Sequence, residues 1–206
     1  MNADEGLDTL QWLETMLPVD RWQRILYVGW HPHTFGKWGG DWYLNHIRGR
    51  TKGMLPKHTI IEGCESYVAQ LHPHPTRARF RIRALQADVT EFVRSSQERF
   101  DVIIWWHGPE HVDQAALGPT LKGLEAMCDG AVVLGCPDGV DDYEDPESGD
   151  KHRCVITESV LQDLGYHTRL LDRTWKEQQP AISAVRLCGE AAKTRATRRT
   201  KVSSGV

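Results

Sequence analysis

Two acidic side chains stand where strand-like runs end, and a carboxylate in that place can bind a ligand. Glu62 closes the apolar run HTIIE, and Asp88 follows the run FRIRAL within the sequence QADVTEFV. A carboxylate accepts hydrogen bonds from two neighbouring hydroxyl groups at once, and in open α/β folds such acids follow a strand. Each also has a structural interpretation: Glu62 as a solvated helix cap, and Asp88 as an N-cap with Glu91 as its capping-box partner. For Asp88 the two roles can coexist.

Histidines recur in pairs, which raises the question of a metal site. The sequence HPH occurs at residues 31–33 and 72–74, and His107 and His111 lie four positions apart. Two histidines at that spacing share one face of a helix, but the glycine and proline between them argue against a regular helix. No third ligand has a recognisable spacing, so we predict no metal site. The pKa range of histidine would let His111 remove a proton from a substrate; the alternative is a loop or helix-cap residue.

The stretch that we expect to position these groups is residues 24–39, RILYVGWHPHTFGKWG. Residues 25–28 are apolar without polar alternation, which predicts a strand buried on both faces of a parallel sheet. Gly29 ends the run, and Gly36 and later glycines supply backbone freedom where the chain turns or approaches a ligand. Ligands of open α/β sheets bind beyond the carboxyl ends of strands, where the strand order reverses. We expect the first strand and its loop to lie at that point.

Strand-like and helix-like segments alternate along the chain. Strands are predicted at residues 25–28, 58–62, 80–85, 100–106, 131–136, 166–171 and 181–187. Helices are predicted before Pro18 and at residues 37–50, 65–71, 112–127 and 155–164. The alternation predicts a parallel sheet covered on both faces by right-handed crossovers and completed by an antiparallel terminal pair. Residues 137–150 are acidic and rich in glycine and proline, which predicts a lid or substrate loop.

The composition bounds the class of protein. The 206 residues suit one domain: we expect a helix within residues 1–20, a core domain at 21–190 and a basic disordered tail at 191–206. A hydrophobic share of 40%, with no signal core and no run long enough to span a membrane, predicts a cytoplasmic protein without a membrane partner. A net charge of −3 supplies no global field for nucleic acid, so only the tail could contact one. Five widely spaced cysteines predict reduced thiols.

Together these landmarks resemble the class I S-adenosylmethionine-dependent methyltransferases, from about Ile25 to Leu187. ILYVGWHPHTFGKWG resembles the family's first strand and glycine loop, and FDVIIWWHGPEHV resembles its fourth-strand signature. The resemblance implies a three-layer Rossmann-like α/β fold with a mostly parallel seven-stranded sheet and an antiparallel C-terminal strand. It implies S-adenosylmethionine as the cofactor, with Glu62 on the ribose hydroxyls and Asp88 at the adenine amino group. The further cofactor contacts that we assign on this basis are Gly29, Trp30, His31, Gly36, Gly63, Val89 and Trp106.

The implied activity is transfer of a methyl group to an acceptor by in-line displacement, which depends on alignment and on exclusion of water. His107 and His111 are our catalytic candidates near the transferred methyl. Trp105 and Trp106 leave the fourth strand on opposite faces, so one is expected in the core and the other could stack on the adenine or the substrate. No feature of the sequence identifies the acceptor.

Two departures from the family pattern leave alternatives open. Tyr27 stands where the family usually has an acid, and residues 31–34 replace the middle glycine with bulkier side chains. His31 or His33 could replace lost contacts, or the altered loop could close the pocket. The alternative function is therefore a catalytically inactive methyltransferase-like scaffold that binds a protein or nucleic acid. A nicotinamide-dependent oxidoreductase ranks below both, because its fingerprint has three glycines in one short turn and an acid about twenty residues later.

Overall fold

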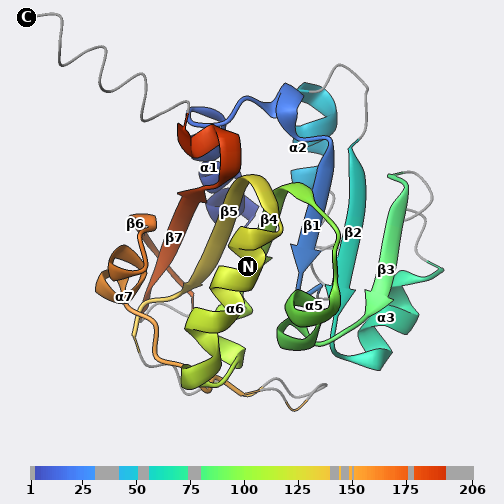
Figure 1. Ribbon diagram of the computed structural model, residues 1–206. Helices are drawn as coiled ribbons and strands as arrows, with labels where there is room; N and C mark the ends of the chain where they lie inside the picture. The colour runs from blue at the N-terminus through green and yellow to red at the C-terminus, as the bar shows by residue number, and fades with distance from the viewer. Residues whose placement is uncertain are drawn as a thin grey trace, which may run out of the picture.

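One seven-stranded sheet runs through the part of the molecule that the computed structural model describes, which is residues 3–30, 42–50, 56–73, 80–139, 144, 149, 151–175 and 179–193. The strand order is β3-β2-β1-β4-β5-β7-β6 (Figure 1). The strands are β1 (Arg24–Val28), β2 (Lys57–Glu62), β3 (Ile82–Gln86), β4 (Phe100–Trp106), β5 (Cys128–Pro137), β6 (His167–Trp175) and β7 (Gln179–Leu187). β7 is antiparallel to its neighbours β5 and β6, and the remaining pairs are parallel. The predicted mostly parallel sheet with an antiparallel C-terminal strand is confirmed.

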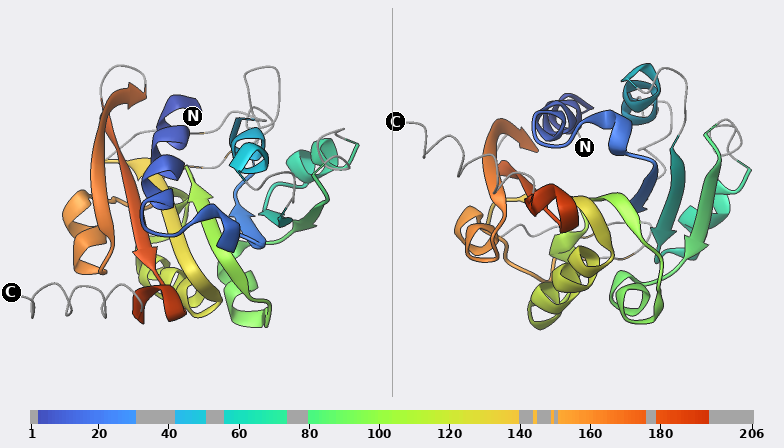
Figure 2. Two further views of the ribbon diagram at one scale, coloured as in Figure 1. Left: turned by 90° about the horizontal axis from the view of Figure 1, so that it is seen from above. Right: turned by 45° about the horizontal axis from the view of Figure 1, so that its top comes forward.

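Helices cover both faces of this sheet (Figures 1 and 2). One face carries α1 (Ala3–Glu14), α2 (Trp42–Arg50) and α3 (Glu65–Leu71), and the other carries α5 (Val89–Ser95), α6 (Gln114–Ala126) and α7 (Glu158–Asp163). Two short 3-10 turns, η1 (Val19–Arg21) and η3 (Pro109–His111), precede β1 and α6. A separate cluster of buried apolar side chains fills the space between the sheet and each helical layer. The result is the expected three-layer arrangement.

Position in the sheet explains the apolar pattern of the strands. β1, β4 and β5 lie in the middle with helices on both sides, and they are apolar on both faces as buried parallel strands must be. β3 is an edge strand, and its side chains alternate: Ile82 and Ala84 are buried, while Arg83 between them is exposed. The alternation of FRIRAL predicted this edge position.

The N-terminal helix packs on the sheet through one face. Leu10 and Leu13 of α1 are buried, and the Thr9 hydroxyl forms a buried 2.9 Å hydrogen bond with Ser183 of β7. Glu14, at the end of α1, lies 2.5 Å from His46 Nε2 and so joins α1 to α2. In the described residues, no helix combines the length and the apolar character needed to cross a membrane.

Several observed boundaries differ from the predicted ones. α6 begins at Gln114 because Val112 and its N-cap Asp113, which follow η3, have extended backbone angles. α7 begins at Glu158, since Thr157 is its N-cap and accepts a hydrogen bond from the Val160 N–H. Residues 189–193 are helical, so the described start of the expected tail is ordered, and residues 194–206 lie outside the described part. Residues 31–41 and most of the predicted 137–150 loop also lie outside it.

Candidate active site

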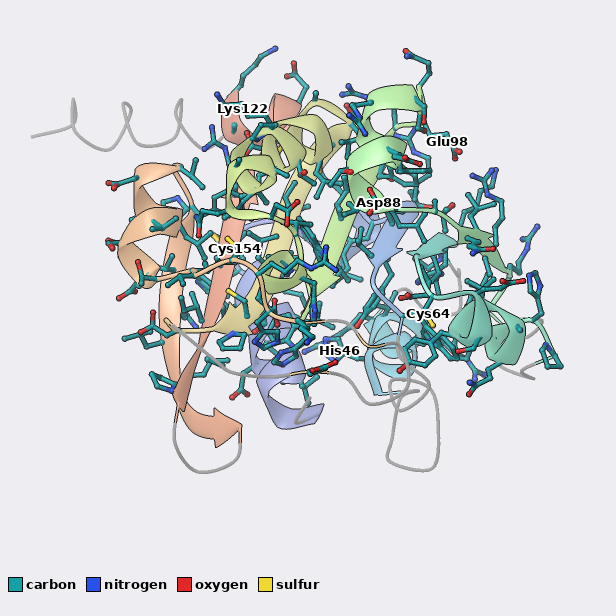
Figure 3. The ribbon with its side chains drawn as sticks, turned by 90° about the horizontal axis from the view of Figure 1, so that it is seen from below. His46, Cys64, Asp88, Glu98, Lys122 and Cys154 are labelled. Carbon is teal, nitrogen blue, oxygen red and sulfur yellow. The ribbon has the colours of Figure 1, made fainter. Side chains whose placement is uncertain are left out.

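The carboxyl ends of four parallel strands lie level with one another. Val28 of β1 pairs with Ile61 of β2 and with Trp105 of β4, and Ile61 in turn pairs with Leu85 of β3. The residues that follow these positions therefore share one edge of the sheet. The chain reverses its strand order between β1 and β4, which is where open α/β sheets bind ligands. Figure 3 looks onto this edge, with Cys64 and Asp88 on one side and Cys154 on the other.

Gly29 turns the chain sharply at the end of β1. Its φ is +77°, a backbone conformation that a side chain would strain, and its N–H donates to the Ile61 carbonyl at 3.0 Å. The next residue, Trp30, is 2% exposed and belongs to the core on the α1 and α2 side. The other predicted contacts in this loop, His31 and Gly36, lie outside the described residues.

Glu62 is held at the end of β2 by its own backbone and by its side chain. Its carbonyl accepts from the Ala87 N–H at 3.0 Å, and its Oε1 accepts from the Cys64 N–H at 2.7 Å. The side chain is half-buried, and the following Gly63 is exposed. A carboxylate that is fixed in this way at the edge of the sheet can present its acceptors to a ligand.

Asp88 caps α5, as one of its two predicted roles requires. Its Oδ1 accepts from the N–H groups of Thr90 at 2.8 Å and Glu91 at 3.1 Å, and from the Thr90 hydroxyl. All three of these hydrogen bonds end on Oδ1, and the residue is exposed, so the cap leaves Oδ2 available to accept from a ligand. Val89, the first residue of the helix, is buried beside it. The cap and a ligand contact are therefore compatible.

Trp105 and Trp106 leave β4 on opposite faces, as predicted. Trp105 belongs to the cluster under α5 and α6 and Trp106 to the cluster under α1 and α2, and both are buried. Glycines make room for both rings: a Cβ on Gly108 would lie 2.1 Å from the Trp105 indole, and one on Gly135 would lie 2.4 Å from the Trp106 ring. The two indoles thus fix the direction in which the chain leaves β4.

The chain leaves β4 through His107, which has a φ of +50° that few residues other than glycine adopt. Its N–H donates to the Gly135 carbonyl at 2.7 Å, which holds it beside the end of β5. The short η3 turn then carries Glu110 into the interior, where the residue is 3% exposed. The Glu110 carbonyl accepts from the N–H groups of Arg153 at 2.8 Å and Cys154 at 3.1 Å. These bonds bring a distant segment against the loop after β4.

Three imidazoles surround the Glu110 carboxylate as a result. His107 Nδ1 lies 3.5 Å and His152 Nε2 lies 3.8 Å from Oε1, and the rings of His111 and His152 meet edge to face with centroids 4.8 Å apart. These contacts are long, and neither carboxylate oxygen has a hydrogen-bond partner among the described residues. Burial by itself raises the pKa of Glu110, but the neighbouring His107 and His111 outweigh it and hold the pKa below its usual range. The pocket therefore holds an ionised carboxylate.

Two thiols close to this group are neutral. Burial first, and then the charge of Glu110, raises the pKa of Cys136 well above its ordinary value, and the same two causes raise the pKa of Cys154. A neutral, buried thiol is not a nucleophile at neutral pH.

Solved structures share this arrangement of strands and helices. An N-methyltransferase, NodS from Bradyrhizobium japonicum WM9, is 13% identical with a TM-score of 0.59 over 90% of this chain and 95% of its own. Magnesium protoporphyrin IX methyltransferase (ChlM) from Synechocystis PCC 6803, with bound SAM, is 12% identical, with a TM-score of 0.56 over 89% of this chain and 79% of its own. The 1,6-didemethyltoxoflavin-N1-methyltransferase of Burkholderia thailandensis, with S-adenosylhomocysteine, is 16% identical, with a TM-score of 0.56 over 91% and 84%.

The chain has the class I methyltransferase fold. At these identities the likeness is one of fold, and it confirms the architecture that the sequence resemblance implied. No protein-family model matches the chain, and no curated protein matches it in sequence.

On the methyltransferase fold, the predicted residues fall into two groups along the same edge. Gly29, Glu62 and Asp88 follow β1, β2 and β3, and His107 and His111 follow β4. The sequence analysis missed Glu110 as the centre of a cluster, and it missed His152 altogether. Glu110 carried a signal, because it stands in the EH pair of the fourth-strand signature. His152 carried none, because its place depends on backbone contacts between distant segments.

Proposed function

We propose that this chain is an S-adenosylmethionine-dependent methyltransferase whose cofactor lies across the carboxyl ends of β1, β2 and β3. The observation that carries the proposal is the strand register, which sets Gly29 level with Glu62 and Glu62 level with Gln86, two residues before Asp88, beside the point where strand order reverses. Neighbouring strands lie about 4.8 Å apart, so three of them span the length of a nucleoside. Solved structures of the same fold with bound SAM and S-adenosylhomocysteine support the same cofactor class.

The residues present fit such a cofactor. Gly29 has a positive φ and no described atom within 4 Å of where its Cβ would lie, so backbone can approach a ligand there. Glu62 would accept from the ribose hydroxyls, Asp88 Oδ2 would accept from the adenine amino group, and Val89 would pack beside the ring. Gly63, Trp30 and Trp106 would shape the walls, with His31 and Gly36 completing the first loop.

Bound S-adenosylmethionine would supply a methyl group activated by its sulfonium. The chain's own contribution would be to align the acceptor and exclude water at the end of β4. His107 and His111, which follow that strand, would orient the acceptor or take its proton. The acceptor itself is not specified by any residue that we describe, and we expect a cytoplasmic setting.

One observation favours the alternative, an inactive scaffold with the methyltransferase fold. Tyr27 is 2% exposed and packs in the core at the β1 position where the family resemblance implies an acid. A scaffold of this kind would bind a macromolecule and would not bind the cofactor.

Calorimetric titration of the purified chain with S-adenosylmethionine and S-adenosylhomocysteine separates the two functions. We expect one-site binding, and at 100 times Kd a stabilisation of about 2.7 kcal/mol, which raises the melting temperature by roughly 5–10 °C for a chain of this size. Absence of both the heat and the thermal shift at millimolar cofactor would establish the scaffold.

Asp88 offers a variant that separates cofactor binding from folding. Asparagine caps helices as well as aspartate does, so the free energy of unfolding of Asp88→Asn should lie within about 0.5 kcal/mol of the wild-type value. Its amide cannot accept from the adenine amino group through Nδ2, so we expect affinity to fall about 10- to 100-fold. Asp20→Asn, at an exposed position in η1, is the matched control and should leave affinity unchanged. Equal affinity of Asp88→Asn and the wild type would remove Asp88 from the cofactor site.

A further inference from the structure

The carboxyl group of Glu110 is buried and poorly satisfied. The residue is 3% exposed, and both oxygens lack a hydrogen-bond partner among the described residues. A polar group in the interior is costly unless it is hydrogen-bonded or coordinates a metal. The histidine contacts at 3.5 and 3.8 Å are too long to be the hydrogen bonds that would stabilise it. The described residues alone therefore leave this group incomplete.

The ligand atoms around it have the composition of a metal site. One carboxylate oxygen of Glu110 and one ring nitrogen each from His111 and His152 lie within 4.8 Å of one another. His111 Nδ1 is itself buried without a hydrogen-bond partner among the described residues. A zinc ion binds such atoms at about 2.0–2.2 Å, so they would stand roughly 3.3 Å apart around it.

We propose that Glu110, His111 and His152 bind a divalent transition-metal ion; His111 is then a ligand, and His107 is the remaining candidate base of the proposed function. Two imidazoles and one carboxylate form a donor set that suits Zn²⁺ and its neighbours in the first transition row, whereas Mg²⁺ and Ca²⁺ prefer oxygen ligands. Three protein ligands leave coordination positions open to water or to an oxygen of a bound molecule. His107, at 3.5 Å from Oε1, orients the carboxylate from outside the ligand set.

The backbone assembles these ligands independently of any ion. Arg153 and Cys154 donate to the Glu110 carbonyl, and the Val155 N–H donates to Gln114 Oε1 at 3.0 Å. The Gly139 N–H also donates to the Ile156 carbonyl at 2.6 Å, which joins the same segment to the end of β5. The hydrogen bonds of the residues that follow His152 therefore hold it against η3. A site that is built before the ion arrives loses less entropy on binding.

Cation binding can be tested without the cofactor and without activity, so the result does not depend on the proposed function. The tag-free full chain, stripped with a chelator, is titrated with Zn²⁺ by calorimetry and with Co²⁺ by visible absorption, which reports coordination by nitrogen and oxygen ligands. We expect one equivalent to bind, and His111→Gln and His152→Gln to weaken binding by about 100-fold or more. His167→Gln, an exposed histidine on β6, is the matched control and should bind as the wild type does.

Glu110→Gln distinguishes a metal ligand from a structural residue. Because it replaces buried oxygens that have no hydrogen-bond partner among the described residues, the metal-free variant should melt at the same temperature as the metal-free wild type or higher. The rise in melting temperature that Zn²⁺ gives the wild type should be lost in this variant. A titration with no one-equivalent step, or a step that survives in the His111→Gln/His152→Gln double variant, would overturn the metal site.

Discussion

His58 is a buried histidine near the start of β2 that has no part in the candidate site. It is 2% exposed, and its Nδ1 donates to the Pro56 carbonyl at 3.0 Å, so the neutral ring carries its proton on Nδ1. Burial disfavours the cation and lowers the pKa from 6.5 to about 4, and the Pro56 hydrogen bond opposes this shift only in part. The unfolded chain therefore takes up a proton at this residue at a higher pH than the folded chain does.

The stability contributed by neutral His58 is complete above the unfolded pKa of 6.5 and is lost as the pH falls toward the folded value of about 4. Between pH 7.5 and 5 we expect His58 to reduce the free energy of unfolding by about 2 kcal/mol. His58→Asn keeps a donor for the Pro56 carbonyl and cannot be protonated, so it should lose less stability over this range. Urea unfolding followed by tryptophan fluorescence measures the free energy of unfolding of the wild type and of His58→Asn at each pH. The same pH dependence in the two proteins would show that His58 is not buried as described.

Which site residues could be predicted depends on what fixes their position. Glu62 ends β2 and Asp88 comes two residues after β3. A parallel sheet brings the ends of its strands to one edge, so local sequence was enough to single out both residues. His152 meets Glu110 only because a backbone carbonyl accepts from Arg153 and Cys154. No spacing encodes that contact, so the search for a third metal ligand in the sequence found none.

At the scale of elements, α5 and α6 pack so closely that a methyl group decides their distance. A Cβ on Gly123 of α6 would lie 2.6 Å from Val93 Cβ and 2.8 Å from its Cγ2. These atoms belong to a β-branched side chain that cannot swing aside, so the two helices would have to move apart. Helix propensity alone would favour alanine by roughly 0.5–1 kcal/mol, and the packing conflict opposes that gain.

We expect Gly123→Ala to destabilise the fold by about 1–3 kcal/mol in chemical unfolding. Gly49→Ala is the control and should be neutral or stabilising, because Gly49 is an exposed glycine of α2 and no described atom lies within 4 Å of where its Cβ would be. Adding Val93→Ala to Gly123→Ala should recover part of the loss, since the two residues compete for the same space. A stabilising Gly123→Ala would contradict the close packing of α5 and α6.

Element types could be predicted better than element ends. All seven strands were expected, most from apolar residues in sequence and β3 from the alternation of apolar and basic residues. β5 nevertheless begins at Cys128, earlier than its apolar run, because Cys128 pairs with Phe100 and Gly130 fits against the Asp101 carbonyl. α7 begins later than its apolar pattern, because the preceding residues are held extended against η3 and β5. Tertiary contacts set both limits, and they are absent from any local window.

At the scale of the whole molecule, the carboxyl ends and the amino ends of the strands form two edges of the sheet with different functions. The carboxyl edge carries the candidate ligand-binding side chains. At the amino edge, the Asp101 carboxylate accepts from the N–H groups of Gln23 at 3.0 Å and Arg24 at 2.8 Å, and from the Arg24 guanidinium at 2.9 Å. Arg24 also reaches Asp129, whose pKa is held below its usual range chiefly by the ion pair with Arg99. These contacts join β1, β4 and β5 where no ligand is expected.

This division predicts that stability and binding can be changed separately. Asp101→Ala removes an acceptor for two backbone N–H groups and an ion pair, so we expect a loss of about 1–3 kcal/mol and a melting temperature lower by several degrees. β4 is 7 residues long, so Asp101 lies roughly 20 Å from the opposite edge, beyond the range over which substitutions usually interact. The affinity of the folded variant for S-adenosylhomocysteine and for Zn²⁺ should therefore equal that of the wild type. Calorimetry well below the melting temperature measures these affinities. A weaker affinity of Asp101→Ala would mean that the charges at the amino edge also affect the structure of the carboxyl edge.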